Sequence, residues 1–158
     1  QLVQQNPKVH FLLLGGGRLI ENLMNDIRMY KLEEHFHLPG LIPPSQVPSY
    51  VECMDIVCHL SLREGLPRAV VQGMAAEKPV VAYELDGAPE VVINDQTGFI
   101  CPPETVNEVQ SALCQLIESP TLRKKLGVGG RELVKKRFSW KKMVDDLEVV
   151  YQQILANK

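Results

Sequence analysis

Residues 55–76 read DIVCHLSLREGLPRAVVQGMAA, and the architecture of the chain can be predicted outward from them. Residues 55–60 form a mostly apolar run that is typical of a strand buried inside a parallel sheet. Pro67 stands where proline suits the first turn of a helix, and Glu64 and Gly65 lie in the loop between strand and helix. Because the start of a helix presents unpaired N–H groups and a partial positive charge, this loop suits a phosphate or a polar sugar.

Strands alternate with helices on both sides of this stretch. Further strands are expected over 9–14, 36–38, 79–83 and 98–101, and helices over 19–32, 47–54, 67–76 and, as a single turn, 90–93. The remaining helices are expected over 106–118, over 121–137 and over 140–156. Three glycines can bend or break the second of these, and Ser139 can cap the last. Such alternation implies right-handed crossovers, so we predict the α/β class, a parallel sheet with helices on both faces.

The composition indicates one globular domain that does not bind nucleic acid. The 158 residues are enough for a core, and the net charge of −2 offers no basic face. No apolar run reaches the roughly 18 residues that span a membrane, and no signal peptide is visible, so we expect a cytoplasmic protein with reduced, mostly buried cysteines. The sequence opens without methionine in what reads as a helix end stopped by Asn6-Pro7, which we interpret as a piece of a longer protein.

Loops that follow the strands should meet at one edge of the sheet, where ligands bind. They are residues 15–17, 40–42, 61–65 and 86–90. The first is the turn Gly15-Gly16-Gly17, whose lack of side chains lets the backbone approach a phosphate; a tight turn without a ligand is the alternative. Its spacing is not the G-x-G-x-x-G of dinucleotide-binding proteins, because position 20 is isoleucine.

The motif that contains Glu64 resembles the carboxylate motif of the retaining GT-B glycosyltransferases of family 4. That motif has two glutamates separated by seven residues; here Glu64 is the first, and Gln72 occupies the place of the second. Residues 86–90 resemble the family's G-G-x-P-E loop, with Asp86 in place of the first glycine. Residues 97–103 and 138–140 are similar to two further motifs, so the resemblance covers nearly the whole chain in the right order.

The resemblance implies a role for each matching residue. Glu64 would be catalytic and contact the transferred sugar, and Gln72 would bind the ribose hydroxyls. An amide lacks the charge-assisted strength of a carboxylate, so we expect this contact to be weaker by roughly 1–2 kcal/mol. Tolerated variation, a changed donor and a degenerate site all remain explanations for Gln72. The implied donor-binding residues are Gly15, Gly16, Gly17, Leu41, Ile42, Gly65, Leu66, Arg68, Gln72, Gly87 and Glu90. Among them, Leu41 and Ile42 would hold the base of the nucleotide.

The implied function is that of the donor-binding, Rossmann-like C-terminal domain of a GT-B enzyme, over residues 1–158. The full-length protein would transfer a sugar, with retention of configuration, from a nucleotide sugar to a glycan or lipid, without a metal or other cofactor. Its first strand, a phosphate-binding Arg/Lys pair and the acceptor domain would lie upstream, so this chain alone should be inactive. The full-length protein could associate peripherally with a membrane. A stand-alone nucleotide or sugar-phosphate binding module is the alternative, and an NAD-dependent dehydrogenase is disfavoured by the glycine spacing.

The histidines carry weaker signals. His35 and His37 can share a strand face as metal ligands would, but without a third ligand nearby we expect them to be structural or exposed, and we predict no metal site. His59 lies in the apolar strand before the motif loop. We expect a core histidine with satisfied hydrogen bonds, and a role in the cleft is the alternative.

Overall fold

The computed structural model describes residues 1–156 and divides the chain into two compact units, Gln1–Met54 and Asp55–Lys158. Strand pairing follows the same division, because β1 pairs with β2 in one sheet, and β3, β4 and β5 pair in another. The strands are parallel throughout, as predicted, but they form two sheets where a single sheet was expected. That the chain acts as one domain stays a prediction.

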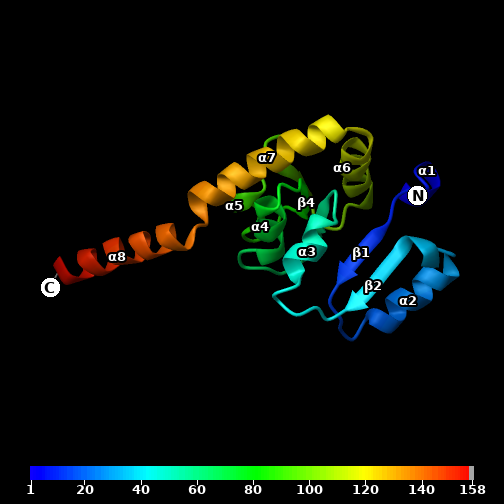
Figure 1. Ribbon diagram of the computed structural model, residues 1–158, viewed down its shortest axis with the longest axis horizontal. Helices are drawn as coiled ribbons and strands as arrows, with labels where there is room; N and C mark the ends of the chain where they lie inside the picture. Colours follow the sequence, from blue (N-terminus) through cyan, green and yellow to red (C-terminus); the bar gives the residue numbers. More distant parts are fainter. Residues whose placement is uncertain (157–158) are drawn as a thin grey trace. The chain divides into compact units, whose positions relative to one another are not determined.

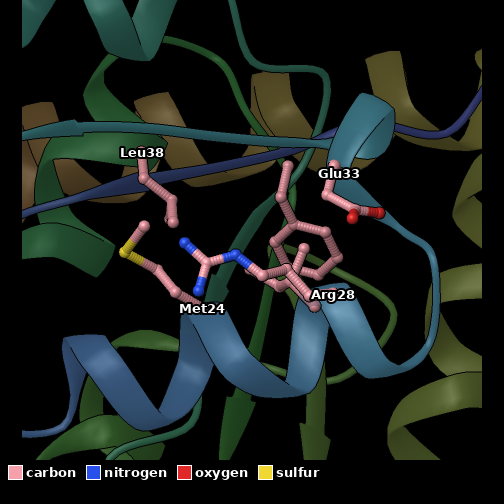
Figure 2. A pocket seen from close by; sticks show the side chains of 6 residues that line it. Met24, Arg28, Glu33 and Leu38 are labelled. Atoms are coloured by element: carbon pink, nitrogen blue, oxygen red, sulfur yellow. The ribbon is translucent and has the colours of Figure 1, made fainter.

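The first unit consists of two parallel strands and short helices (Figure 1). Its elements are α1 (Leu2–Gln5), β1 (Phe11–Leu14), α2 (Ile20–Met29), the 3-10 helix η1 (Glu33–His35), β2 (Phe36–Gly40) and α3 (Val47–Glu52). Phe11 lies opposite Phe36 in the register, and the two rings stack with centroids 4.6 Å apart. Figure 2 shows an open hollow beside α2 and β2, lined by Met24, Ile27, Arg28, Glu33, Phe36 and Leu38.

The second unit is built on a three-stranded parallel sheet with β4 at its centre. Its elements are β3 (Val57–His59), α4 (Arg68–Ala75), β4 (Val80–Tyr83), α5 (Ala88–Val91), β5 (Gly98–Cys101), α6 (Val106–Glu118), α7 (Pro120–Arg137) and α8 (Trp140–Ala156). Val80, Val81 and Ala82 are fully buried, as expected for consecutive apolar residues in a strand that is covered on both faces.

Helices cover both faces of this sheet. On one face α4 approaches β3 closely, since a Cβ atom on Gly73 would lie 2.7 Å from Cγ2 of Val57. On the other face Val81 packs in a buried cluster with Leu116 of α6 and Leu126 of α7. This confirms the predicted α/β class, and successive side chains of β4 point to opposite faces as strand geometry requires.

Helix α7 is continuous, although its glycines were expected to bend or break it. A Cβ atom on Gly127 would lie 1.9 Å from the carbonyl oxygen of Glu77, and one on Gly129 would lie 2.2 Å from that of Gln96. The glycines therefore allow the helix backbone to approach neighbouring backbone. The propensity cost of about 1 kcal/mol per glycine is offset by this close packing.

The remaining differences concern element ends and cysteines. Helix α4 begins at Arg68 with Pro67 as the residue before it, and α5 covers Ala88–Val91 where a turn over 90–93 was expected. All four cysteines are free, but Cys53 and Cys58 are exposed, where mostly buried thiols were expected. Burial raises the pKa of the Cys101 thiol, so that thiol stays protonated and unreactive at neutral pH.

The last helix, α8, begins as predicted. The hydroxyl of Ser139 accepts a hydrogen bond from the backbone N–H of Lys142 at 3.1 Å, which confirms the expected cap. None of the described residues of α8 is buried. Within residues 1–156, no helix combines the length and the apolar character that crossing a membrane requires.

Candidate functional site

The loop between β3 and α4 is fixed by its own side chains. The Ser61 hydroxyl donates to the carbonyl of Arg63 at 3.0 Å and accepts from its N–H at 3.4 Å, which makes a tight turn just before Glu64. Pro67 is fully buried at the far end of the loop. The Glu64 side chain, 38% exposed, is therefore presented from a loop that is held at both ends.

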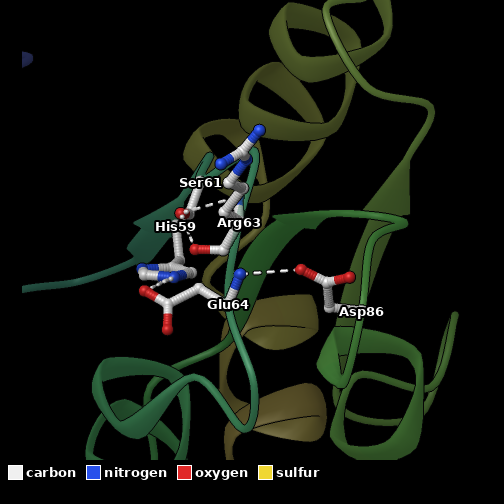
Figure 3. Close-up of polar contacts among 5 residues, drawn as sticks. All are labelled: His59, Ser61, Arg63, Glu64 and Asp86. Atoms are coloured by element: carbon white, nitrogen blue, oxygen red, sulfur yellow. Dashed lines mark hydrogen bonds and ion pairs between the residues drawn. The ribbon is translucent and has the colours of Figure 1, made fainter.

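Two hydrogen bonds join this loop to the loop between β4 and α5. The backbone N–H of Glu64 donates to Oδ2 of Asp86 at 2.7 Å, and the N–H of Gly87 donates to the carbonyl of Gly65 at 3.1 Å. Gly87 must be glycine here, because a Cβ atom would lie 2.5 Å from the Gly65 oxygen. Figure 3 shows Asp86 facing the amide of Glu64, while the Glu64 carboxylate points toward His59.

His59 contacts Glu64 directly. Its Nε2 atom lies 3.3 Å from Oε1 of Glu64, and its side chain is 21% exposed. The two atoms are not aligned for a hydrogen bond, so the buried Nε2 atom has no hydrogen-bond partner among the described residues. The expectation of a satisfied core histidine was wrong, because β3 ends at His59 and directs its ring beside the motif loop. When protonated, this imidazole would attract the carboxylate.

The start of α4 presents polar groups to solvent. No side chain caps the helix, so the N–H groups of its first two residues, Arg68 and Ala69, are open to an anion. Arg68 and Gln72 lie one turn apart and are both exposed, so they share a face of α4 as predicted. Leu66 is exposed in the loop before the helix. Glu90 is exposed on α5, and its carbonyl accepts from Nη1 of Arg137 at 3.0 Å.

The other predicted donor-binding residues lie in the first unit. Gly15 and Gly17 have φ angles of +123° and +153°, which glycine adopts at little cost. A Cβ atom on Gly16 would lie 4.0 Å from Cγ of Leu41, so the glycine turn and Leu41 are neighbours. Leu41 is 86% exposed, and Ile42 is half-buried. That these residues share a binding edge with Glu64 stays a prediction.

Parallel pairing brings a third histidine to His35 and His37. Nδ1 of His10 lies 3.1 Å from Nε2 of His37, and His35 donates from Nδ1 to the carbonyl of Val9 at 2.8 Å. His10 was not predicted as a neighbour of His35 and His37, because it is far away along the chain. Among residues 1–156, no group of three or more histidine, cysteine, aspartate or glutamate residues is placed to hold a metal ion.

Sequence comparisons connect these loops to known proteins. The chain matches the family described as Glycosyl transferases group 1 over residues 1–133. An uncharacterised glycosyltransferase from Methanocaldococcus jannaschii is 32% identical over 145 residues, which are 92% of this chain and 41% of the relative. The chain belongs to the glycosyl transferases group 1 family. It thus spans about two fifths of the length of this relative.

Solved structures share the fold of this group 1 chain. Sucrose-phosphate synthase from Thermosynechococcus elongatus has a TM-score of 0.86 at 26% identity, over 98% of this chain and 40% of that chain. The Anabaena protein HepE, solved in complex with UDP-glucose, has a TM-score of 0.87 at 24% identity, over 96% of this chain and 43% of that chain. The fold is therefore the Rossmann-like half of a GT-B glycosyltransferase, as the motifs predicted.

The contacts of His59 and Asp86 with Glu64 were missed in the sequence analysis. Strand alternation contained a signal for His59. It lies two residues after Val57 in the strand, so both side chains point to the same face, which α4 covers. The signal for Asp86 was an aspartate in place of a motif glycine. The backbone of Asp86 is left-handed, at φ +49°, a conformation that glycine adopts readily and aspartate occasionally.

Proposed function

We propose that this chain binds the nucleotide sugar in a glycosyltransferase that transfers the sugar to a glycan or lipid acceptor. The observation that supports the proposal best is the joining of the Glu64 loop to the Gly87 loop beside the uncapped start of α4, in a chain of this family. A carboxylate next to open backbone N–H groups suits a ligand that carries sugar hydroxyls at one end and phosphates at the other.

Most of the predicted residues take a distinct role in this mechanism. Glu64 accepts hydrogen bonds from hydroxyls of the transferred sugar and orients it for retention of configuration. The first N–H groups of α4 and the Arg68 guanidinium stabilise the diphosphate as its negative charge develops. Gln72, one turn further along α4, binds the ribose, and no metal or other cofactor is needed. Gly15, Gly16, Gly17, Leu41 and Ile42 contribute the nucleotide side of the site.

The acceptor binds outside this chain in the proposal. The chain covers about two fifths of the matched relatives, so the acceptor domain belongs to the remainder of the full-length protein. We place that protein in the cytoplasm, where nucleotide sugars are the donors for such transfer, and propose that it can associate peripherally with a membrane that holds a lipid acceptor.

The test uses the full-length protein with a panel of nucleotide sugars. Glu64→Ala should lower the rate of transfer by on the order of a hundredfold, because the sugar is no longer oriented, while free nucleotide diphosphate still binds. Gln72→Glu should tighten nucleotide diphosphate binding by roughly 1–2 kcal/mol in calorimetric titration. Glu132→Ala, which removes an exposed glutamate from α7, is the matched control and should change neither quantity.

Two outcomes would contradict the proposal. Nucleotide binding without transfer from any donor would favour the stand-alone binding module. Loss of nucleotide binding in Glu64→Ala, with unchanged affinity in Gln72→Glu, would reverse the assignment of the sugar end and the ribose end. The anomeric configuration of the product, measured by NMR, tests retention.

A further inference from the structure

The same neighbouring loop binds the backbone just before and just after Glu64. The N–H of Glu64 is bound by the Asp86 carboxylate at 2.7 Å, and the carbonyl of the next residue, Gly65, is bound by the N–H of Gly87 at 3.1 Å. The Cα atoms of Glu64 and Gly65 lie between these two bonds, so the bonds restrain the backbone from which the Glu64 side chain leaves. A hydrogen bond to an ionised carboxylate is stronger than one between neutral groups, so the Asp86 bond is the stronger restraint of the two.

Asp86 makes this bond from an unfavourable backbone conformation. Its φ of +49° lies in the left-handed region, which favours glycine. An aspartate adopts this backbone conformation at a higher conformational energy than a glycine does, and the hydrogen bond to the Glu64 amide compensates for that energy. The motif that this loop resembles has a glycine here, so the carboxylate is a departure of this chain from that motif.

The Asp86 and Glu64 carboxylates do not compete for the same partner. Figure 3 shows Asp86 on the amide side of Glu64, whereas the Glu64 carboxylate points the other way, toward His59. Nε2 of His59, 3.3 Å from Oε1 of Glu64, limits how far the carboxylate can swing. Asp86 therefore restrains the backbone of Glu64, and the Glu64 carboxylate remains available to a ligand.

We propose that Asp86 is a positioning residue for Glu64: it orients the Glu64 carboxylate toward the transferred sugar and acts on the rate of transfer only through Glu64. This inference rests on the proposed function. Because the Asp86 carboxylate is engaged by the Glu64 amide, we expect Asp86 to set the rate of transfer and to leave nucleotide affinity unchanged.

The test compares three substitutions of Asp86 in the full-length protein. Asp86→Ala and Asp86→Gly remove the acceptor and should lower kcat by roughly ten- to a hundredfold, while the dissociation constant of free nucleotide diphosphate changes less than about twofold. Asp86→Asn keeps an oxygen acceptor and should retain most of the activity. Asp86→Gly also relieves the backbone strain, so a low kcat in this variant separates loss of the bond from loss of loop stability.

The matched control is Asp95→Ala. Asp95 is exposed in the same unit and also has a left-handed backbone, at φ +62°, but its side chain makes no hydrogen bond or ion pair among the described residues. This variant should leave kcat unchanged. If Asp95→Ala lowered kcat as much as Asp86→Ala, the effect would belong to left-handed aspartates in general, and the inference would be overturned.

A double-mutant cycle with Glu64→Ala tests whether Asp86 acts through Glu64. In the Glu64→Ala background, Asp86→Ala should change kcat less than about threefold, because no carboxylate remains to be misplaced. The inference would be overturned if the fold-losses of kcat in the two single variants multiplied in the double variant. It would also be overturned if Asp86→Ala weakened nucleotide binding by as large a factor as it lowered kcat. If the unsubstituted protein transfers no sugar from any donor, the proposed function fails; if it is active and the cycle is multiplicative, only the role of Asp86 fails.

Discussion

Helices α7 and α8 begin in the same way and lie in different surroundings. Each follows a serine whose hydroxyl accepts from the N–H three residues later, Ser119 from Leu122 at 3.2 Å and Ser139 from Lys142 at 3.1 Å. Helix α7 has few large apolar side chains, yet its contact face is buried, whereas no described residue of α8 is buried.

The difference shows that the burial of a helix depends on the surface it meets more than on its apolar content. In α7 the absence of a side chain at Gly127 allows backbone to meet backbone, and Leu126 fills the core beside it. In α8 the apolar side chains recur at three- and four-residue spacing along the helix, but they are exposed: Trp140, Met143, Val144, Leu147, Val150, Tyr151 and Ile154. Local capping starts both helices, and only tertiary contact buries one of them.

The largest effect is expected from shortening the buried leucine of α7. Leu126→Ala leaves a cavity in the cluster that contains Val81 and Leu116, so we expect the free energy of unfolding to fall by about 2–5 kcal/mol. Urea unfolding followed by circular dichroism measures this loss. A loss below about 1 kcal/mol would mean that α7 is not part of the core as described.

A smaller loss is expected from adding a methyl group to the glycine contact. In Gly127→Ala the new Cβ atom would meet the Glu77 carbonyl oxygen, so helix and loop must separate, at a cost of about 1–3 kcal/mol. Gly130→Ala is the matched control, because its Cβ atom would lie 3.1 Å from Cγ of Met74, a tight contact with a side chain where Gly127 would meet backbone, and helix propensity improves by about 1 kcal/mol. Equal losses in the two variants, measured by thermal unfolding, would argue against the backbone contact.

The smallest effect is expected when the same leucine-to-alanine change is made in α8. Leu147 is 47% exposed and fills no described cavity, so Leu147→Ala should change the free energy of unfolding of this chain by less than about 0.5 kcal/mol. The same urea experiment measures it next to Leu126→Ala. A loss that approached that of Leu126→Ala would show that α8 packs against a surface after all.

The pattern of apolar runs and capping residues predicted most of the fold. The runs that contain Val57 and Val80 became parallel strands, and Ser139 caps α8, because these signals are local and strong. Helix α7 does not break at any of its three glycines. Propensity alone raised that possibility, because it describes a helix in isolation and carries no information about a carbonyl oxygen on a neighbouring segment.

The site was predictable where a motif stands in one segment and less so where two segments meet. Glu64 and Gly65 could be assigned to the loop from their neighbours in the sequence. The hydrogen bond from the Glu64 amide to Asp86 joins residues in different crossovers. The contact with His59 depends on the direction in which the last residue of β3 points its side chain. The sequence contains a signal for each residue separately, but that they contact Glu64 can be seen only in the three-dimensional structure.

The parallel pairing of the strands also has a consequence for how the chain folds. Val57 pairs with Val80 and Val80 pairs with Gly98, so each ladder joins residues roughly 20 positions apart, and none can start as a hairpin. Closing each loop lowers the entropy of the chain before any contact between the strands stabilises the closed state. Helix α4, which spans one of these crossovers, shortens the distance to be closed when it forms early. The speed of folding of the second unit should therefore depend on the helical propensity of α4 more than on that of α8, which closes no loop.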